Sequence, residues 1–123
     1  MPDKVMTKQE IQKLVELGLE ANGCNKENSS AVARTIAAAE LDGCAAHGLF
    51  RMPGYVASLR SGKVNGNASP VVYRLSPGVV KVDGDHGYAP LALEKGREAL
   101  IQATQENGIA AMVLVNVHHF AAL

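Results

Sequence analysis

The 123-residue sequence has no tryptophan, and its aromatic content is limited to three tyrosines and two phenylalanines. So few aromatic side chains argue against a surface on which nucleic-acid bases stack. The 12 basic and 12 acidic residues cancel to a formal net charge of zero. Because no overall charge draws the chain to nucleic acid or to an anionic membrane, we expect neither among its partners.

Signals for export and membrane insertion are also missing. The apolar run Ile109–Val115 is far too short to span a bilayer, and the start, Met1–Lys4, has no apolar signal-peptide core. Two cysteines, Cys24 and Cys44, are too few for a disulfide scaffold. We therefore expect reduced thiols and a cytoplasmic protein.

Common cofactor and metal motifs are absent as well. Neither G-x-G-x-x-G nor G-x-x-x-x-G-K-[ST] occurs, so no classical dinucleotide-binding turn is expected. Asp83 and Asp85 lack the rest of a calcium loop, and His86 between them and Gly87 is interpreted as a turn residue. His118 and His119 have no cysteine or acidic residue at the spacing of zinc ligands. We predict no metal site.

The 47% of apolar residues suffices for a core, and the first half of the chain has helical periodicity. Thr7 and Glu10 have the spacing of a capping box. Pro53 fits the first turn of a third helix. The expected helices run from Thr7 to Asn22–Gly23, from Asn28, Ser29 or Ser30 to Asp42–Gly43, and from Gly48 to Gly62.

The pattern of apolar and turn-forming residues in the second half of the chain predicts strands on either side of one long helix. The expected elements are a hairpin of Val71–Leu75 and Val79–Val82, a loop at Gly84–Gly87, a helix from about Ala89 to Gln105, and a strand Ile109–Val115 buried on both faces. The fold class is therefore α/β (α+β), with a helical region before a hairpin, a helix and a buried strand. Because the chain stops soon after an apolar segment, we expect it to be the front part of a longer, truncated fold.

Charge is unevenly distributed along the chain. Between Gly43 and Val82 there are five basic residues and no acidic one. These are Arg51, Arg60, Lys63, Arg74 and Lys81. They form either an ordinary solvated face or a site for a small anion, such as a carboxylate or a cofactor phosphate.

His47 and Arg51 make the most specific local pattern, because residues four apart face the same way on one helical turn. Arg51 would hold a carboxylate by a two-pronged ion pair, and His47 would give or take a proton at the adjacent carbon. The alternative is a surface histidine and a surface arginine on a helix.

A second pattern, Asn116–Phe120, directly follows the predicted buried strand. Ligands of open α/β sheets bind at the carboxyl ends of strands. Adjacent side chains of an extended chain point to opposite sides, so at most one of His118 and His119 is expected to enter a site. The alternative is a histidine that packs or caps the strand end.

Two separated segments, Leu41–Tyr55 with its His-Gly-x-x-Arg pattern and Asn116–Leu123, together resemble the malate/L-lactate dehydrogenase family. This family is NAD(P)-dependent and has its own non-Rossmann fold. The ending is most similar to the Δ1-piperideine-2-carboxylate/Δ1-pyrroline-2-carboxylate reductase branch. The resemblance implies an N-terminal fragment, with residues 1–62 as a helical region carrying the substrate-binding motif and residues 63–123 as the first part of the NAD(P)-binding domain.

The resemblance also implies roles for individual residues. His47 matches the proton donor, and Arg51 matches a residue that binds the substrate carboxylate. The stretch that matches the lining of the NADPH or NADH cofactor is His119, Phe120, Ala121, Ala122 and Leu123. Ala46 and Val117 stand where many relatives have serine, and alanine cannot take part in a hydrogen-bond relay through its side chain.

The function implied by the resemblance is reduction of cyclic imine 2-carboxylates to L-pipecolate or L-proline, with a small anionic carboxylate as substrate and a homodimer as the assembly. One alternative is a 2-hydroxy acid dehydrogenase of the malate or lactate type. Another is a non-catalytic truncated remnant or dimerisation module. The 123-residue piece alone is expected to be inactive.

Overall fold

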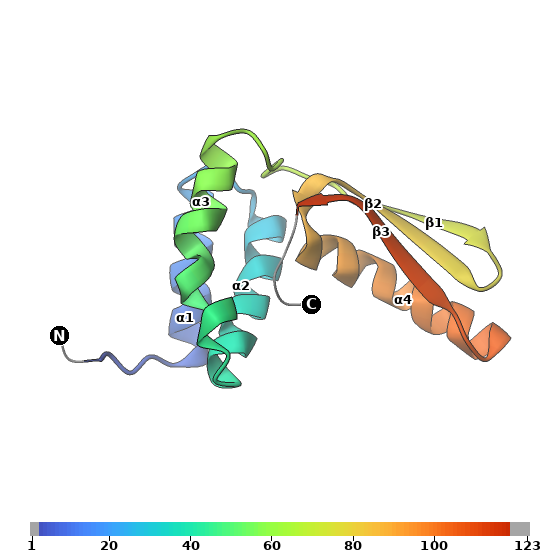
Figure 1. Ribbon diagram of the computed structural model, residues 1–123, viewed down its shortest axis with the longest axis horizontal. Coiled ribbons are helices and arrows are strands. Elements are labelled where there is room, and N and C mark those ends of the chain that lie inside the picture. Colours follow the sequence, from blue (N-terminus) through green and yellow to red (C-terminus); the bar gives the residue numbers. More distant parts are fainter. Residues whose placement is uncertain (1–2, 119–123) are drawn as a thin grey trace.

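A computed structural model describes residues 3–118 (Figure 1). Three helices stand side by side, and a three-stranded sheet lies over a fourth helix. The elements are α1 (Lys8–Glu20), α2 (Lys26–Leu41), the 3₁₀ turns η1 (Ala45–His47) and η2 (Leu49–Arg51), α3 (Met52–Arg60), β1 (Val71–Ser76), β2 (Val79–Tyr88), α4 (Ala89–Asn107) and β3 (Ala111–His118). This mixture confirms the predicted α/β (α+β) class.

The helix starts follow from side-chain caps. At α1 the capping box is confirmed: the Glu10 N–H donates to Thr7 Oγ1 over 3.1 Å, and the Thr7 N–H donates to the Glu10 carboxylate over 3.4 Å. The predicted start of α2 at residues 28–30 is wrong, because Asn25 caps the helix by accepting the Asn28 N–H at 3.0 Å. Asn28 is instead buried, and its amide donates to Ala68 O at 2.9 Å.

The helices close around an apolar core that also takes in the junction of β2 and α4. Tyr88 and Ala89, at this junction, are buried with the helical residues. Fully enclosed side chains from α1 and α2 include Val15, Leu19, Val32 and Ile36. The helical core is therefore joined directly to the sheet region.

The sheet has the order β1-β2-β3. β1 and β2 are antiparallel, which confirms the hairpin, whereas β2 and β3 are parallel and α4 is the crossover between them. α4 covers one face, where Ala92 and Ala103 pack on Val80 and Val82. A side chain at Gly96 would collide with Met112 and Val82, so the helix approaches this face closely.

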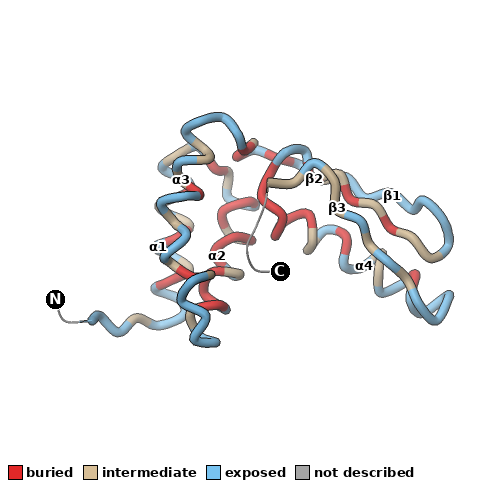
Figure 2. The backbone as a smooth tube through the Cα atoms, viewed as in Figure 1, coloured by how far each residue is buried: buried red, intermediate tan, exposed pale blue. Residues whose placement is uncertain are grey.

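The predicted burial of the last strand on both faces is wrong. Among the described residues β3 is an edge strand, and α4 covers only one of its faces. Val113 is accordingly 45% exposed, while Met112 and Leu114 pack toward α4. All six residues of β1 are also exposed, and Figure 2 shows this strand in pale blue beside the buried positions of β2.

The predicted loop at Gly84–Gly87 is also wrong, because β2 continues through it to Tyr88. The strand is nevertheless irregular there: Asp85 and His86 have φ of 53° and 60°, and the register with β3 shifts between Asp83 and Gly87. The turn-forming residues produce a bulge inside the strand instead of ending it.

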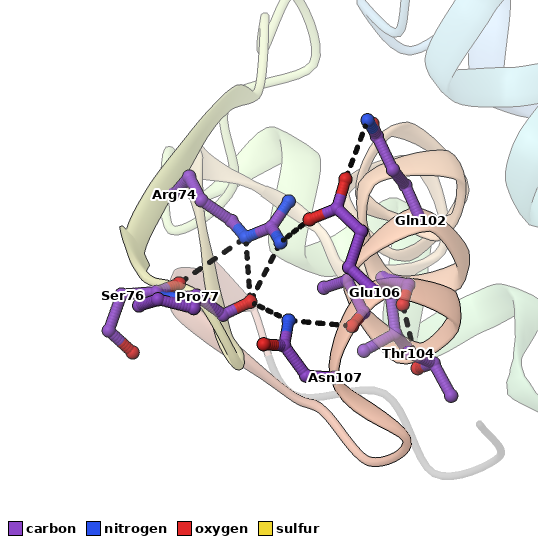
Figure 3. A network of polar contacts seen from close by, with 9 residues as sticks. Arg74, Ser76, Pro77, Gln102, Thr104, Glu106 and Asn107 are labelled. Carbon is purple, nitrogen blue, oxygen red and sulfur yellow. Dashed lines mark hydrogen bonds and ion pairs between the residues drawn. The ribbon is translucent and has the colours of Figure 1, made fainter.

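Arg74 ties the hairpin turn to the end of α4 (Figure 3). Its guanidinium donates to Pro77 O at 2.7 Å and to the Glu106 carboxylate at 2.8 Å. The Asn107 side chain donates to the same carbonyl at 2.7 Å. This network fixes the hairpin against α4.

From residue 3 to residue 118, no helix is long and apolar enough to cross a membrane.

Candidate functional site

The backbone between His47 and Arg51 is not one helical turn, so this prediction is wrong. His47 ends η1 and Arg51 ends η2, and between these turns Gly48 has the non-helical dihedrals φ −96° and ψ −138°. The Glu40 carboxylate holds this break by accepting the Leu49 N–H at 2.8 Å. A side chain at position 48 would collide with that carboxylate. Gly48 thus lets the chain turn sharply onto Glu40, so that no regular helix connects the two predicted site residues.

His47 lines a cavity of about 490 Å³ between α2, α4 and the corner that follows α2. Arg34 of α2 and Glu94 of α4 form a two-pronged ion pair at its wall, with N–O distances of 3.0 and 2.6 Å. Arg97 also lines it and has no polar partner among residues 3–118. The remaining lining residues are Thr35, Ala38, Ala39, Asp42, Cys44, Pro90 and Leu93.

One ring nitrogen of His47 is buried without a hydrogen-bond partner within the described residues. This nitrogen, Nδ1, is sealed from solvent. Because Nδ1 is sealed, Nε2 is the ring nitrogen of His47 that is left for contact with a ligand.

Arg51 does not line this cavity. Its Nε donates to Ala46 O at 2.7 Å. The Arg51 guanidinium is therefore held beside the backbone of Ala46, the residue that precedes His47. Burial raises the pKa of Tyr55, and the positive charge of Arg51 partly opposes that rise.

The carboxyl ends of β2 and β3 meet α3 in an aromatic contact that we call the strand-end junction: Tyr55, Ser58, Tyr88 and His118. The Tyr88 hydroxyl donates to Tyr55 O at 2.7 Å, and burial raises its pKa well above the usual range. The His118 ring lies 5.9 Å from the Tyr88 ring, and its Nε2 is 3.2 Å from Ser58 Oγ. His118 thus packs at the strand end.

The second predicted motif is only partly within the described residues. Asn116, Val117 and His118 belong to β3. The five residues expected to line the cofactor, His119, Phe120, Ala121, Ala122 and Leu123, lie outside the described residues.

The basic residues of the middle segment do not gather into one anion site. Arg60 donates to Asn22 Oδ1 at 2.8 Å, Arg74 is held at α4, and the Lys81 ammonium lies 5.8 Å from the centre of the Tyr73 ring. This distribution favours the interpretation as a solvated face. The cations at the cavity, Arg34 and Arg97, were missed by sequence reasoning, because 63 positions separate them and neither belongs to the basic segment.

The chain is similar to known proteins over nearly its whole length. The sequence model of the family described as Malate/L-lactate dehydrogenase matches residues 6–123. A Delta(1)-pyrroline-2-carboxylate reductase of Ancylobacter novellus is 48% identical over 93% of this chain and 33% of its own length. A Delta(1)-pyrroline-2-carboxylate/Delta(1)-piperideine-2-carboxylate reductase of Pseudomonas putida is 42% identical over the same shares.

A solved structure is similar over almost the whole chain. It is the delta1-piperideine-2-carboxylate reductase of Pseudomonas syringae pvar. tomato, with a TM-score of 0.94 and 36% identity over 98% of this chain and 36% of that one. The chain thus spans about a third of the length of the relatives it matches.

Proposed function

Because the chain belongs to the malate/L-lactate dehydrogenase family, we propose that its gene product is a nicotinamide-dependent reductase of cyclic imine 2-carboxylates. The substrates are Δ1-pyrroline-2-carboxylate and Δ1-piperideine-2-carboxylate, and the products are L-proline and L-pipecolate. Support comes from the relatives in Ancylobacter novellus and Pseudomonas putida, whose names give these substrates. The activity is proposed for the whole gene product, since the chain spans a third of such relatives.

The observation that carries this proposal is the setting of His47. Its ring lines a cavity while its Nδ1 is sealed and without a partner within the described residues, so Nε2 is the ring nitrogen available to a ligand. A reduced nicotinamide, when bound, supplies the hydride that goes to the imine carbon. His47 supplies the proton that the ring nitrogen of the imine takes up.

The described residues fit a nicotinamide group in one respect. Part of the cavity wall beside His47 is apolar and offers a surface for the nicotinamide ring, whereas the rest of the wall is charged. The apolar residues are Ala38, Ala39, Pro90 and Leu93, and the charged ones are Arg34, Asp42, Glu94 and Arg97. The residues that would hold the cofactor, His119–Leu123, are assigned by family resemblance alone. Three further expectations stay predictions. They are the division into residues 1–62 and 63–123, the homodimer, and the choice of NADPH over NADH.

For the substrate carboxylate we propose Arg51. Its Nη groups have no partner among the described residues, because only Nε is occupied, by Ala46 O. Both Nη groups are thus free to grip a carboxylate in two-pronged fashion. Arg97 at the cavity is the alternative guanidinium for binding the substrate carboxylate. The KM of variants at each position distinguishes the two.

The test is an assay of the gene product, expressed to its stop codon, for NADPH oxidation with Δ1-piperideine-2-carboxylate, pyruvate and oxaloacetate. We expect the cyclic imine to be the preferred substrate. His47→Ala should lower turnover by about 10²–10⁴-fold, the usual contribution of a positioned acid. Unchanged turnover removes His47 from the reaction. A preference for oxaloacetate or pyruvate favours the 2-hydroxy acid alternative, and no oxidation with any of them favours the non-catalytic one.

The same assay decides between the guanidinium groups. Arg51→Ala should raise KM and leave kcat nearly unchanged, because it removes binding energy common to substrate and transition state. Lys63→Ala is the matched control, since Lys63 is an exposed loop cation. A raised KM in Arg97→Ala, with Arg51→Ala unaffected, assigns the carboxylate to the cavity instead.

A further inference from the structure

The parallel strands β2 and β3 lose their regular pairing at one point. Asp83 pairs with Val115, and the next pair is Gly87 with Val117. Between these pairs β2 contains residues 84–86, three residues, whereas β3 contains Asn116 alone. We call residues 83–87 and Asn116 the double bulge, because both strands depart from extended geometry here.

Every non-glycine residue with positive φ in the described chain lies in the double bulge. Asp85, His86 and Asn116 have φ of 53°, 60° and 53°. This conformation costs on the order of 1–2 kcal/mol for each such residue, and Asn, Asp and His are the types that adopt it most readily. Three such residues at one point persist only where the surroundings fix them.

The Asp83 carboxylate fixes both strands at once. One oxygen accepts the Asp85 N–H at 3.0 Å, and the other accepts the Asn116 side-chain amide at 3.2 Å. The Asp85 N–H and then the Asn116 amide lower the pKa of Asp83. A side chain at Gly84 would collide with Val117, so the strands approach closely beside this carboxylate.

The left-handed turn at Asn116 changes which side chains of β3 face inward. Before it, Met112 and Leu114 pack on the core and Val113 is exposed. Regular alternation would next turn residue 116 inward and residue 117 outward. Instead Asn116 is exposed and Val117 packs on both cores. The double bulge thus shifts the alternation by one residue just before His118.

We propose that Asp83 and Asn116 are positioning residues that set the direction in which β3 reaches the strand-end junction. Their contact places His118 against Tyr88 and Ser58, and with it the point from which His119–Leu123 continue. The effect on cofactor binding rests on the proposed function. Neither side chain has to touch the cofactor or the substrate.

The test uses three variants of the 123-residue chain and of the gene product. Asn116→Asp puts two carboxylates face to face, and Asp83→Asn combined with Asn116→Asp restores an amide-to-carboxylate hydrogen bond in the reverse direction. Asp3→Asn is the control, because Asp3 is exposed and lies outside every element. The readouts are the nuclear Overhauser contact between the His118 and Tyr88 rings, the NADPH dissociation constant and the melting temperature.

We expect Asn116→Asp to lose the ring contact and to weaken NADPH binding by between about twofold and a hundredfold, the coupling found within one hydrogen-bond network. The double variant should recover both readouts. A ring contact that survives in Asn116→Asp, or a double variant that does not recover it, overturns the inference. Wild-type protein that fails to bind NADPH overturns the proposed cofactor, and the ring contact still decides the positioning role.

Discussion

The helical region and the sheet region differ in how far each encloses its apolar side chains. α1, α2 and α3 pack around a core in which Val32 and Ile36 are fully buried. The sheet is covered by α4 on one face only, so Leu75 is 61% and Val113 is 45% exposed. Buried apolar area is the main stabilising term. We infer that the helical region supplies most of the stability, and that the sheet region depends on its attachment to it.

The strongest test of this difference substitutes the same residue type in each region. Val32→Ala should lower the free energy of unfolding by about 2–3 kcal/mol, since it removes two buried methyl groups and leaves a cavity. Val113→Ala should cost less than about 1 kcal/mol, because the side chain is half in water already. Urea unfolding monitored by circular dichroism gives both values. Equal losses would refute the unequal distribution of stability.

A smaller effect is expected where the two regions join. Tyr88→Phe removes the buried hydrogen bond from the Tyr88 hydroxyl to Tyr55 O. We expect a loss of about 0.5–1.5 kcal/mol, the net contribution of one such hydrogen bond. Tyr73→Phe on the open strand is the matched control and should change stability by less than about 0.5 kcal/mol. If the two variants are equally stable, the Tyr88 hydroxyl does not hold the regions together.

The two thiols test the same difference between the regions through their reactivity, with the smallest disturbance to the protein. Cys24 is buried in the helical core, and burial followed by the charge of Glu20 raises its pKa to about 11, whereas Cys44 is exposed. At pH 8 Cys24 is therefore almost wholly the unreactive thiol. A chromogenic disulfide reagent should modify Cys44 rapidly, and Cys24 only as the pH approaches 11 or urea unfolds the core. Cys44→Ser should abolish the fast phase, and equal rates would contradict a closed core.

Features that depend on near neighbours in the chain were predictable from sequence. The Thr7 capping box, the hairpin and Pro53 at the start of α3 are all as predicted, because local hydrogen bonds and dihedral preferences determine them. The backbone break at Gly48, between His47 and Arg51, was not predictable. It depends on Glu40, a distant side chain that reaches the Leu49 N–H.

Contacts between distant segments were likewise missed. The cavity brings residues of α2 and α4 together, and the junction joins Tyr55 to Tyr88 across 33 positions. The sequence shows each side chain but not the partner element that encloses it. The apolar run of β3 fits a strand covered on both faces, and only the sheet order reveals that one face and one edge stay open in the described chain.

The parallel pairing of β2 with β3 has a consequence for the order of folding. The β1–β2 hairpin closes over the short turn at Pro77–Gly78, an event of about 1–10 μs in isolated hairpins. β3 pairs only after the whole of α4 has formed and folded back, which carries a larger loop-closure entropy. The strand that ends at His118 is therefore expected to dock last, and mutations in it should act mainly on the unfolding rate.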